Sequence, residues 1–235
     1  MTTPATPALP RGADGQQRAE RFVRDVLGVC AGSKGAQADL RSGLGLPYDR
    51  CQRMHRHLVR LMPDTVQVPQ ARRHYYAVAA LIAARSRRAR DEETERATAG
   101  PRPHGTASQP GAEGTPSWWE RPNLGASLAE AVNRGLIAAR SAESELHLLA
   151  RVGSDSVHTR LPALIGQITG RGVELDWAVL LHDLTGWDYR QDRIATRWLE
   201  AYFRVRDRHE RSLTQPPESG ADRNDSQDET PQENQ

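Results

Sequence analysis

Arginines with helical spacing are the residues of this 235-residue chain best suited to a chemical task. One series steps by three, four and three residues, the spacing of a single helix face, and comprises Arg50, Arg53, His57 and Arg60. The helix predicted to carry them, residues 49–62, contains one acidic residue, Asp49, so i,i+4 ion pairs do not account for these arginines. Unpaired guanidinium groups in this pattern favour binding to the phosphates of a nucleic-acid backbone over a plain solvated face.

The charge of the chain is unevenly distributed, although its formal net value is only +2. Residues 1–90 carry 16 basic and six acidic side chains, a net charge of +10. Residues 91–117 carry −3, residues 118–211 carry zero and residues 212–235 carry −5. A first third this basic is the electrostatic signature expected of a protein that attracts a polyanion.

Motifs for catalysis are missing from the sequence: it has no P-loop, no G-x-G-x-x-G, no G-x-S-x-G and no H-E-x-x-H. His55 and His57 point to different faces of a helix, and Cys51 lies on its apolar stripe, so a zinc site is not expected. Carboxylates that a metal-dependent nuclease would need are spread over several predicted helices: Glu143, Glu145, Asp176, Asp183, Asp188 and Asp192. We therefore expect neither enzymatic activity nor a cofactor or metal.

Apolar spacing throughout the chain predicts an all-α fold of about eight or nine helices. The predicted helices are residues 17–27, 36–44, 49–62, 70–90, 124–140, 141–150, 161–169, 176–185 and 190–209, with Asp176 as an N-cap. Most aromatic side chains fall on apolar stripes and are predicted to pack in the core: Phe22, Tyr75, Tyr76, Trp177, Trp187, Trp198, Tyr202 and Phe203. With no stacking platform indicated, the expected contact is with phosphates and independent of base sequence.

Composition divides the chain into two predicted helical lobes and three stretches too polar to form a core. The basic lobe is residues 16–90 and the C-terminal lobe is residues 118–212; each is small, so we expect them to pack on each other. The stretches predicted to be disordered are residues 1–15, the linker 91–117 and the acidic tail 213–235. No apolar run is long enough for a membrane helix or a signal peptide, which predicts a cytoplasmic protein with reduced thiols.

Several sequence segments in their order resemble the CasB family, the small subunit of the type I-E CRISPR surveillance complex called Cascade. The segments are LRSGLG at 40–45, RRHYYAVAAL at 72–81, NLGASL at 123–128 and VELDWAVLLHDL at 173–184, followed by Trp187. The resemblance spans about residues 20–205. It rests on the order of these segments and on the breaker-rich gap before Asn123, because no single segment is diagnostic.

This resemblance implies an all-α, non-catalytic subunit present as two copies, with a basic surface along the hybrid of crRNA and target DNA that also holds the displaced strand. Its implied partners are therefore crRNA, target DNA and the other Cascade subunits. Basic residues within the matching segments are candidates for backbone contact: Arg41, Arg50, Arg53, Arg60, Arg72, Arg73, Arg140 and Arg160. The alternative left open by the residues is a helical adaptor that binds only protein through the region from Trp177 to Trp198.

Overall fold

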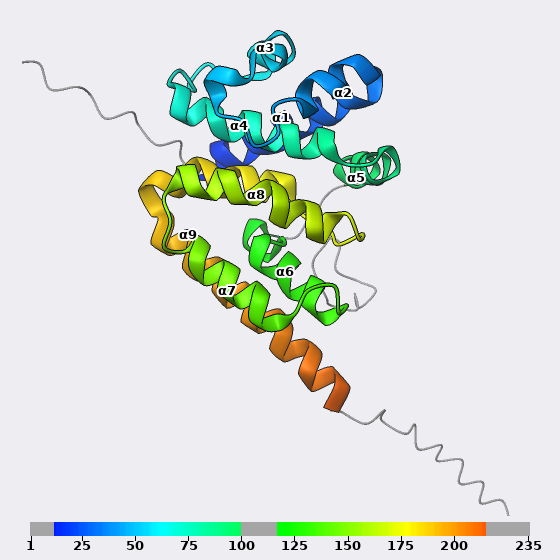
Figure 1. The fold of residues 1–235 in the computed structure, drawn as a ribbon, viewed down its shortest axis with the longest axis vertical. Coiled ribbons are helices and arrows are strands. Elements are labelled where there is room, and N and C mark those ends of the chain that lie inside the picture. The colour runs from blue at the N-terminus through cyan, green and yellow to red at the C-terminus, as the bar shows by residue number, and fades with distance from the viewer. Residues whose placement is uncertain (1–11, 100–116, 215–235) are drawn as a thin grey trace, which may run out of the picture.

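The computed structural model describes residues 12–99 and 117–214, and all regular structure within these ranges is helical (Figure 1). The α-helices there are α1 (Gly12–Gly32), α2 (Lys34–Arg41), α3 (Gln52–Leu58), α4 (Pro69–Ala84), α5 (Arg87–Ala99), α6 (Leu124–Asn133), α7 (Ala139–Leu149), α8 (Ser154–Thr169) and α9 (Trp177–Thr214). Three short 3-10 turns accompany them: η1 (Tyr48–Arg50), η2 (Val59–Leu61) and η3 (Trp118–Glu120). The prediction of an all-α protein with eight or nine helices is confirmed.

The ends of the helices show where neighbouring residues are enough to predict a helix boundary and where they are not. The side chain of Asp176 caps α9, as predicted, because its Oδ1 accepts hydrogen bonds from the backbone N–H groups of Ala178 and Val179 at 3.0 Å. The helix predicted for residues 70–90 is instead two helices, since Arg85 adopts an extended conformation with ψ of 153° between α4 and α5. Within α9, Arg190 leaves helical geometry with φ of −142°, which separates the two helices predicted there by a kink.

The stretches predicted to be disordered lie mostly outside the described residues, but their edges differ from the prediction. Helix α1 begins at Gly12, before the expected limit of residue 15. Helix α5 continues to Ala99, beyond the expected start of the linker at Asp91, where i,i+4 pairs such as Arg88 with Glu92 join the charges of the segment. The C-terminal helix extends to Thr214.

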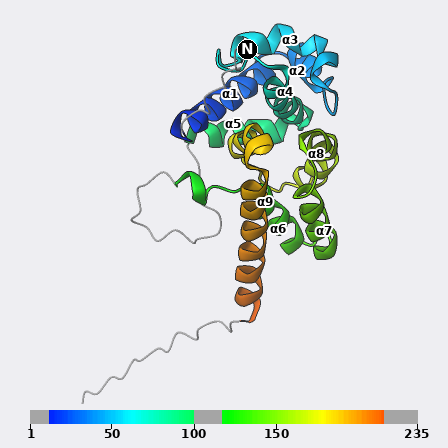
Figure 2. The same cartoon turned by 90° about the vertical axis from the view of Figure 1, so that its left-hand side faces the viewer.

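Helix α9 joins the two halves of the molecule. Figure 1 shows α1 to α5 at one end, α6 to α8 beside the middle, and the final turns of α9 projecting past α7. In Figure 2, α9 runs vertically below the end formed by α1 to α5. It packs against α1 and α4 from the first half and against α6 from the second. One continuous core of buried apolar side chains therefore runs from Phe22 to Tyr202.

Helix α6 crosses close to α9 at Gly125. A Cβ atom placed on Gly125 would overlap the backbone carbonyl of Trp198, so only glycine fits there.

Of the aromatic residues predicted to be in the core, Phe203 is half exposed and the prediction for it is wrong; the other seven are buried. Among the described helices, none is both long and apolar enough to cross a membrane.

Candidate nucleic-acid interface

The arginine series of residues 50–60 lies on a segment that is less regular than predicted. Instead of one helix over residues 49–62, the chain forms turn η1, helix α3 and turn η2, because Cys51 takes φ of −85° and ψ of 39° between η1 and α3. Cys51, predicted to lie on the apolar stripe, is buried together with Met54 and Leu58. Arg50, Arg53 and Arg60 are exposed.

These three arginines keep their guanidinium groups free. None forms an ion pair or hydrogen bond with any residue in the described ranges. Arg41, exposed at the end of α2, shares that property. Helices α2 and α3 are in contact, so one end of the molecule carries four arginines whose donors are available to a ligand.

An acidic residue from another helix does meet this segment. Arg56 pairs with Asp39 of α2, and His57 Nε2 lies 2.9 Å from the same carboxylate. Hydrogen bonds from His57 and then Arg56 hold the pKa of Asp39 below its usual value. The sequence correctly shows that no acid within the segment pairs with its arginines, but Asp39 removes His57 and Arg56 from the free set.

Arg72 and Arg73, at the start of α4, are already engaged within the protein. The Nε of Arg72 donates to the Val66 carbonyl at 3.0 Å, and its Nη1 lies 3.2 Å from the Tyr48 hydroxyl. Arg73 is largely buried and pairs with Asp155 at the start of α8; burial lowers the pKa of its guanidinium. Both side chains therefore tie α4 to neighbouring segments.

Arg140 and Arg160 lie in the second half of the chain, on α7 and α8. Arg140 is exposed near the start of α7 and has no partner among the described residues. Arg160 of α8 pairs with Glu145 of α7, with Nη1 and Oε1 3.2 Å apart. The eight candidates thus divide into a cluster of four free arginines at the α2–α3 end, two anchored arginines on α4 and two on α7 and α8.

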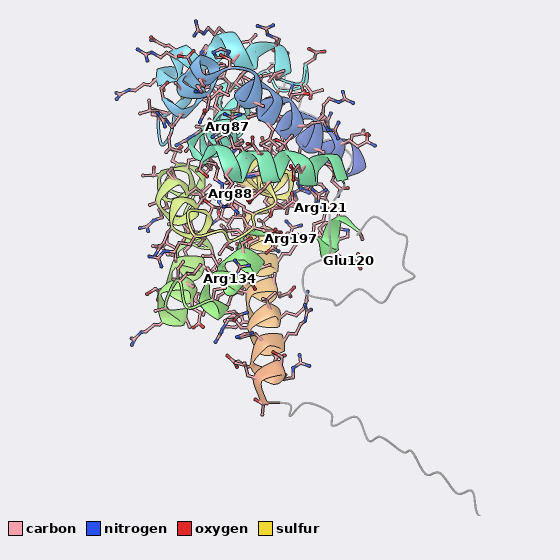
Figure 3. The ribbon with its side chains drawn as sticks, turned by 90° about the vertical axis from the view of Figure 1, so that its right-hand side faces the viewer. Arg87, Arg88, Glu120, Arg121, Arg134 and Arg197 are labelled. Atoms are coloured by element: carbon pink, nitrogen blue, oxygen red, sulfur yellow. The ribbon has the colours of Figure 1, made fainter. Side chains whose placement is uncertain are left out.

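The exposed ring of Trp119 is a surface feature that the sequence did not predict. Trp119 of η3 is 63% exposed, and the Arg197 guanidinium lies over its ring, 5.3 Å from the centroid. Figure 3 shows Arg197 together with Glu120 and Arg121 on one side of the molecule. The only sequence signal was the pair of tryptophans at 118–119, and a doublet cannot tell which ring is buried.

Three of the six carboxylates considered for a nuclease site pair with separate arginines. Asp176 pairs with Arg121, Asp183 with Arg197 and Glu145 with Arg160, so each is drawn toward an arginine rather than toward another carboxylate. No group of three or more histidine, cysteine or acidic side chains within residues 12–99 and 117–214 is placed to hold a metal ion. A cavity of about 390 Å³ between α4, α8 and α9 is lined by Arg73, Asp155 and Asp188 among others.

Two pairs of buried side chains, two cysteines and two histidines, are of reactive types but are uncharged. Cys30 and Cys51 are buried free thiols, and burial raises the pKa of Cys30 to about 11, far from the thiolate form needed of a nucleophile. His74 of α4 and His158 of α8 share a hydrogen bond of 2.8 Å between Nδ1 and Nε2. Burial lowers their pKa values to about 4 and about 3, so both rings are neutral at pH 7.

Comparison with known proteins connects this arrangement to one family. The family described as CRISPR-associated protein Cse2 matches residues 36–203. Two solved structures entitled "CRISPR RNA-guided surveillance complex", the second marked "pre-nicking", contain chains 31% and 33% identical to this one, with TM-scores of 0.67 and 0.68. The matches cover 85% and 84% of this chain and 99% and 98% of those chains.

A more distant crystal structure extends the likeness of fold. CasB from M. ruber is 21% identical, with a TM-score of 0.61 over 84% of this chain and 98% of its own. At that identity it supports the fold alone. A search of curated proteins gives no match.

Proposed function

Since the chain belongs to the Cse2 family of CRISPR-associated proteins, also called CasB, we propose that it is a non-catalytic subunit of an RNA-guided surveillance complex and holds nucleic acid by its backbone. The observation that carries the contact is the group of four exposed arginines without described partners, Arg41, Arg50, Arg53 and Arg60. The family that the sequence segments suggested is the one that matches residues 36–203.

Phosphate rather than base edges is the ligand that these arginines suit. Arg50, Arg53 and Arg60 follow one another on η1, α3 and η2, so each can contact a different phosphate of one strand. Arginine presents a planar fork of donors that matches phosphate oxygens. Because α3 is only seven residues long and flanked by 3-10 turns, it is not a helix shaped to enter a major groove.

A contact of this kind suits an assembly in which base pairing reads the sequence. In RNA-guided effectors the protein recognises the backbone and geometry of the hybrid, and the guide supplies specificity. The chain would lie along the crRNA–target hybrid and the displaced strand and so stabilise the R-loop, acting as two copies beside the other subunits. Arg72, Arg73, Arg140 and Arg160 stay as further candidates for this contact.

The adaptor alternative, a helical protein that binds only other proteins, would use exposed parts of the region from Trp177 to Trp198. The three tryptophans of that region are buried, whereas Tyr189 is 63% exposed. Partner binding that is insensitive to salt, with no retention of DNA or RNA, would favour this role over nucleic-acid binding.

The test is a triple variant, Arg50→Ala, Arg53→Ala and Arg60→Ala, assayed for binding to unrelated DNA duplexes over a range of salt concentrations. We expect weaker binding by a similar factor for every duplex, and a slope of log affinity against log salt that falls by about 0.9 per lost phosphate contact. A matched control removes three exposed arginines held in i,i+4 pairs: Arg87, Arg88 and Arg211. Unchanged affinity and slope in the first variant would refute the proposed contact.

A further inference from the structure

Trp119 is an exposed indole on a firmly anchored turn. Its neighbour Trp118 is buried, and the Arg121 guanidinium lies 4.5 Å from the centroid of the Trp118 ring. Arg121 also pairs with Asp176 and Glu20, while the backbone N–H of Ser117 donates to Glu120 Oε2 at 2.8 Å to close a capping box. Anchors on both sides therefore hold Trp119 at the surface.

The group beneath Trp119 is anchored as well. Arg197 of α9 pairs with Asp183, a carboxylate that is 1% exposed. The other oxygen of that carboxylate accepts a hydrogen bond of 2.7 Å from the Trp198 indole N–H. The ion pair with Asp183 thus fixes the Arg197 guanidinium, and cation–π attraction holds it against the Trp119 ring. An aromatic ring backed on one side and open on the other is preorganised for stacking.

Charges along the same face of α9 bear on what would stack there. Arg193 and Arg204 are four residues before and seven residues after Arg197, positions on one face of a helix. Both are exposed and neither has a partner among the described residues. Glu200, also exposed, lies between them, so this face of α9 carries both signs of charge.

We propose that Trp119 is a stacking site for an unpaired nucleobase, with Arg193 and Arg204 placed for the flanking phosphates. Bases within a duplex already stack on their neighbours, so an exposed indole can receive only a base from a single strand. The inference rests on the proposed function, and it adds a second contact on α9 and η3, distinct from the phosphate contact at the α2–α3 end. It also assigns that contact to single strands.

Intrinsic fluorescence offers a direct measurement, because Trp119 is the one exposed indole among the five and all five lie in described segments. The full chain is titrated with single-stranded oligothymidylate and, in parallel, with a DNA duplex. We expect the oligothymidylate to quench the fluorescence and the duplex to leave it nearly unchanged. Trp119→Ala should abolish the quenching and weaken binding of the oligothymidylate about tenfold, whereas Trp119→Tyr should retain most of the affinity.

Controls separate this inference from the proposed function. Phe203→Ala removes an exposed aromatic side chain of α9 and should leave oligothymidylate binding unchanged. Trp119→Ala should leave duplex affinity and its salt slope unchanged, while the triple variant of Arg50, Arg53 and Arg60 should lower them and leave the quenching. Equal binding of oligothymidylate by the parent and by Trp119→Ala would overturn the stacking site without affecting the phosphate contact. Quenching that persists while the triple variant binds duplex normally would leave the stacking site and refute the phosphate contact.

Discussion

Each arginine has the same donors, and its neighbours decide whether those donors serve the fold or a ligand. Arg53 has no partner among the described residues, while Arg72 donates hydrogen bonds to the Val66 carbonyl and the Tyr48 hydroxyl. Arg73 lies between these cases, because its Nε is buried without a hydrogen bond although it pairs with Asp155. A basic residue can therefore be judged as a contact for nucleic acid only once its partners within the protein are known.

Arg72 and Arg53 provide a matched comparison at this scale. We expect Arg72→Ala to lower the melting temperature by a few degrees, because two hydrogen bonds that tie α4 to η1 and to the Val66 segment disappear. Arg53→Ala should leave the melting temperature unchanged and weaken DNA binding more than Arg72→Ala does. Thermal unfolding and binding assays on both variants check this. A melting temperature unaffected by Arg72→Ala would show that its partners contribute nothing to stability.

Helices were the most predictable elements, and their junctions the least. The apolar stripe of Cys51, Met54 and Leu58 and the cap of Asp176 follow from side chains within a few residues of one another. The break at Arg85 has no proline or glycine to mark it in the sequence, and the helices on its two sides, α4 and α5, both pack against α1. Local patterns carry no information on such packing, so the predicted segment 70–90 ran through the junction.

The crossing of α6 over α9 gives a prediction for an element. Gly125→Ala places a Cβ against the Trp198 backbone carbonyl, which cannot move without displacing α9, and should destabilise the fold by about 3 kcal/mol. Gly166→Ala is the control, because nothing lies within 4 Å of a Cβ there and alanine favours a helix by about 0.5–1 kcal/mol over glycine. Urea unfolding of both variants measures the difference. Equal midpoints for Gly125→Ala and the parent would mean that the two helices do not cross so closely.

At the scale of the whole molecule, the contacts that join the two halves connect residues far apart in sequence. Arg73 meets Asp155 across 82 positions, and Arg121 meets Glu20 across 101. Nothing in local spacing reveals either pair, which is why Arg73 could be recognised as basic but not as engaged. The same limit applies to Trp119, whose ring meets Arg197 from 78 positions further along the chain. The division into two lobes stays a prediction, since the buried core runs continuously through both halves.

The His74–His158 pair, which links α4 to α8, makes the stability of the whole molecule sensitive to acid. Its rings are buried beside Arg73, and the half-exposed Asp188 carboxylate, 3.9 Å from His74 Nε2, does not offset that burial. The folded pKa of His74 is about 4 against an ordinary value of 6.5, so between these pH values the unfolded chain binds the extra proton. The contribution of His74 to the free energy of unfolding is therefore fully present above about pH 6.5. It is lost as the pH falls toward 4, at a cost of about 3 kcal/mol.

Urea midpoints measured from pH 7 to pH 4.5 should fall steadily, and His158→Gln, which removes one of the two titrating rings, should flatten the curve. A midpoint that stays constant over this range would mean that the two histidines are solvated in the folded protein.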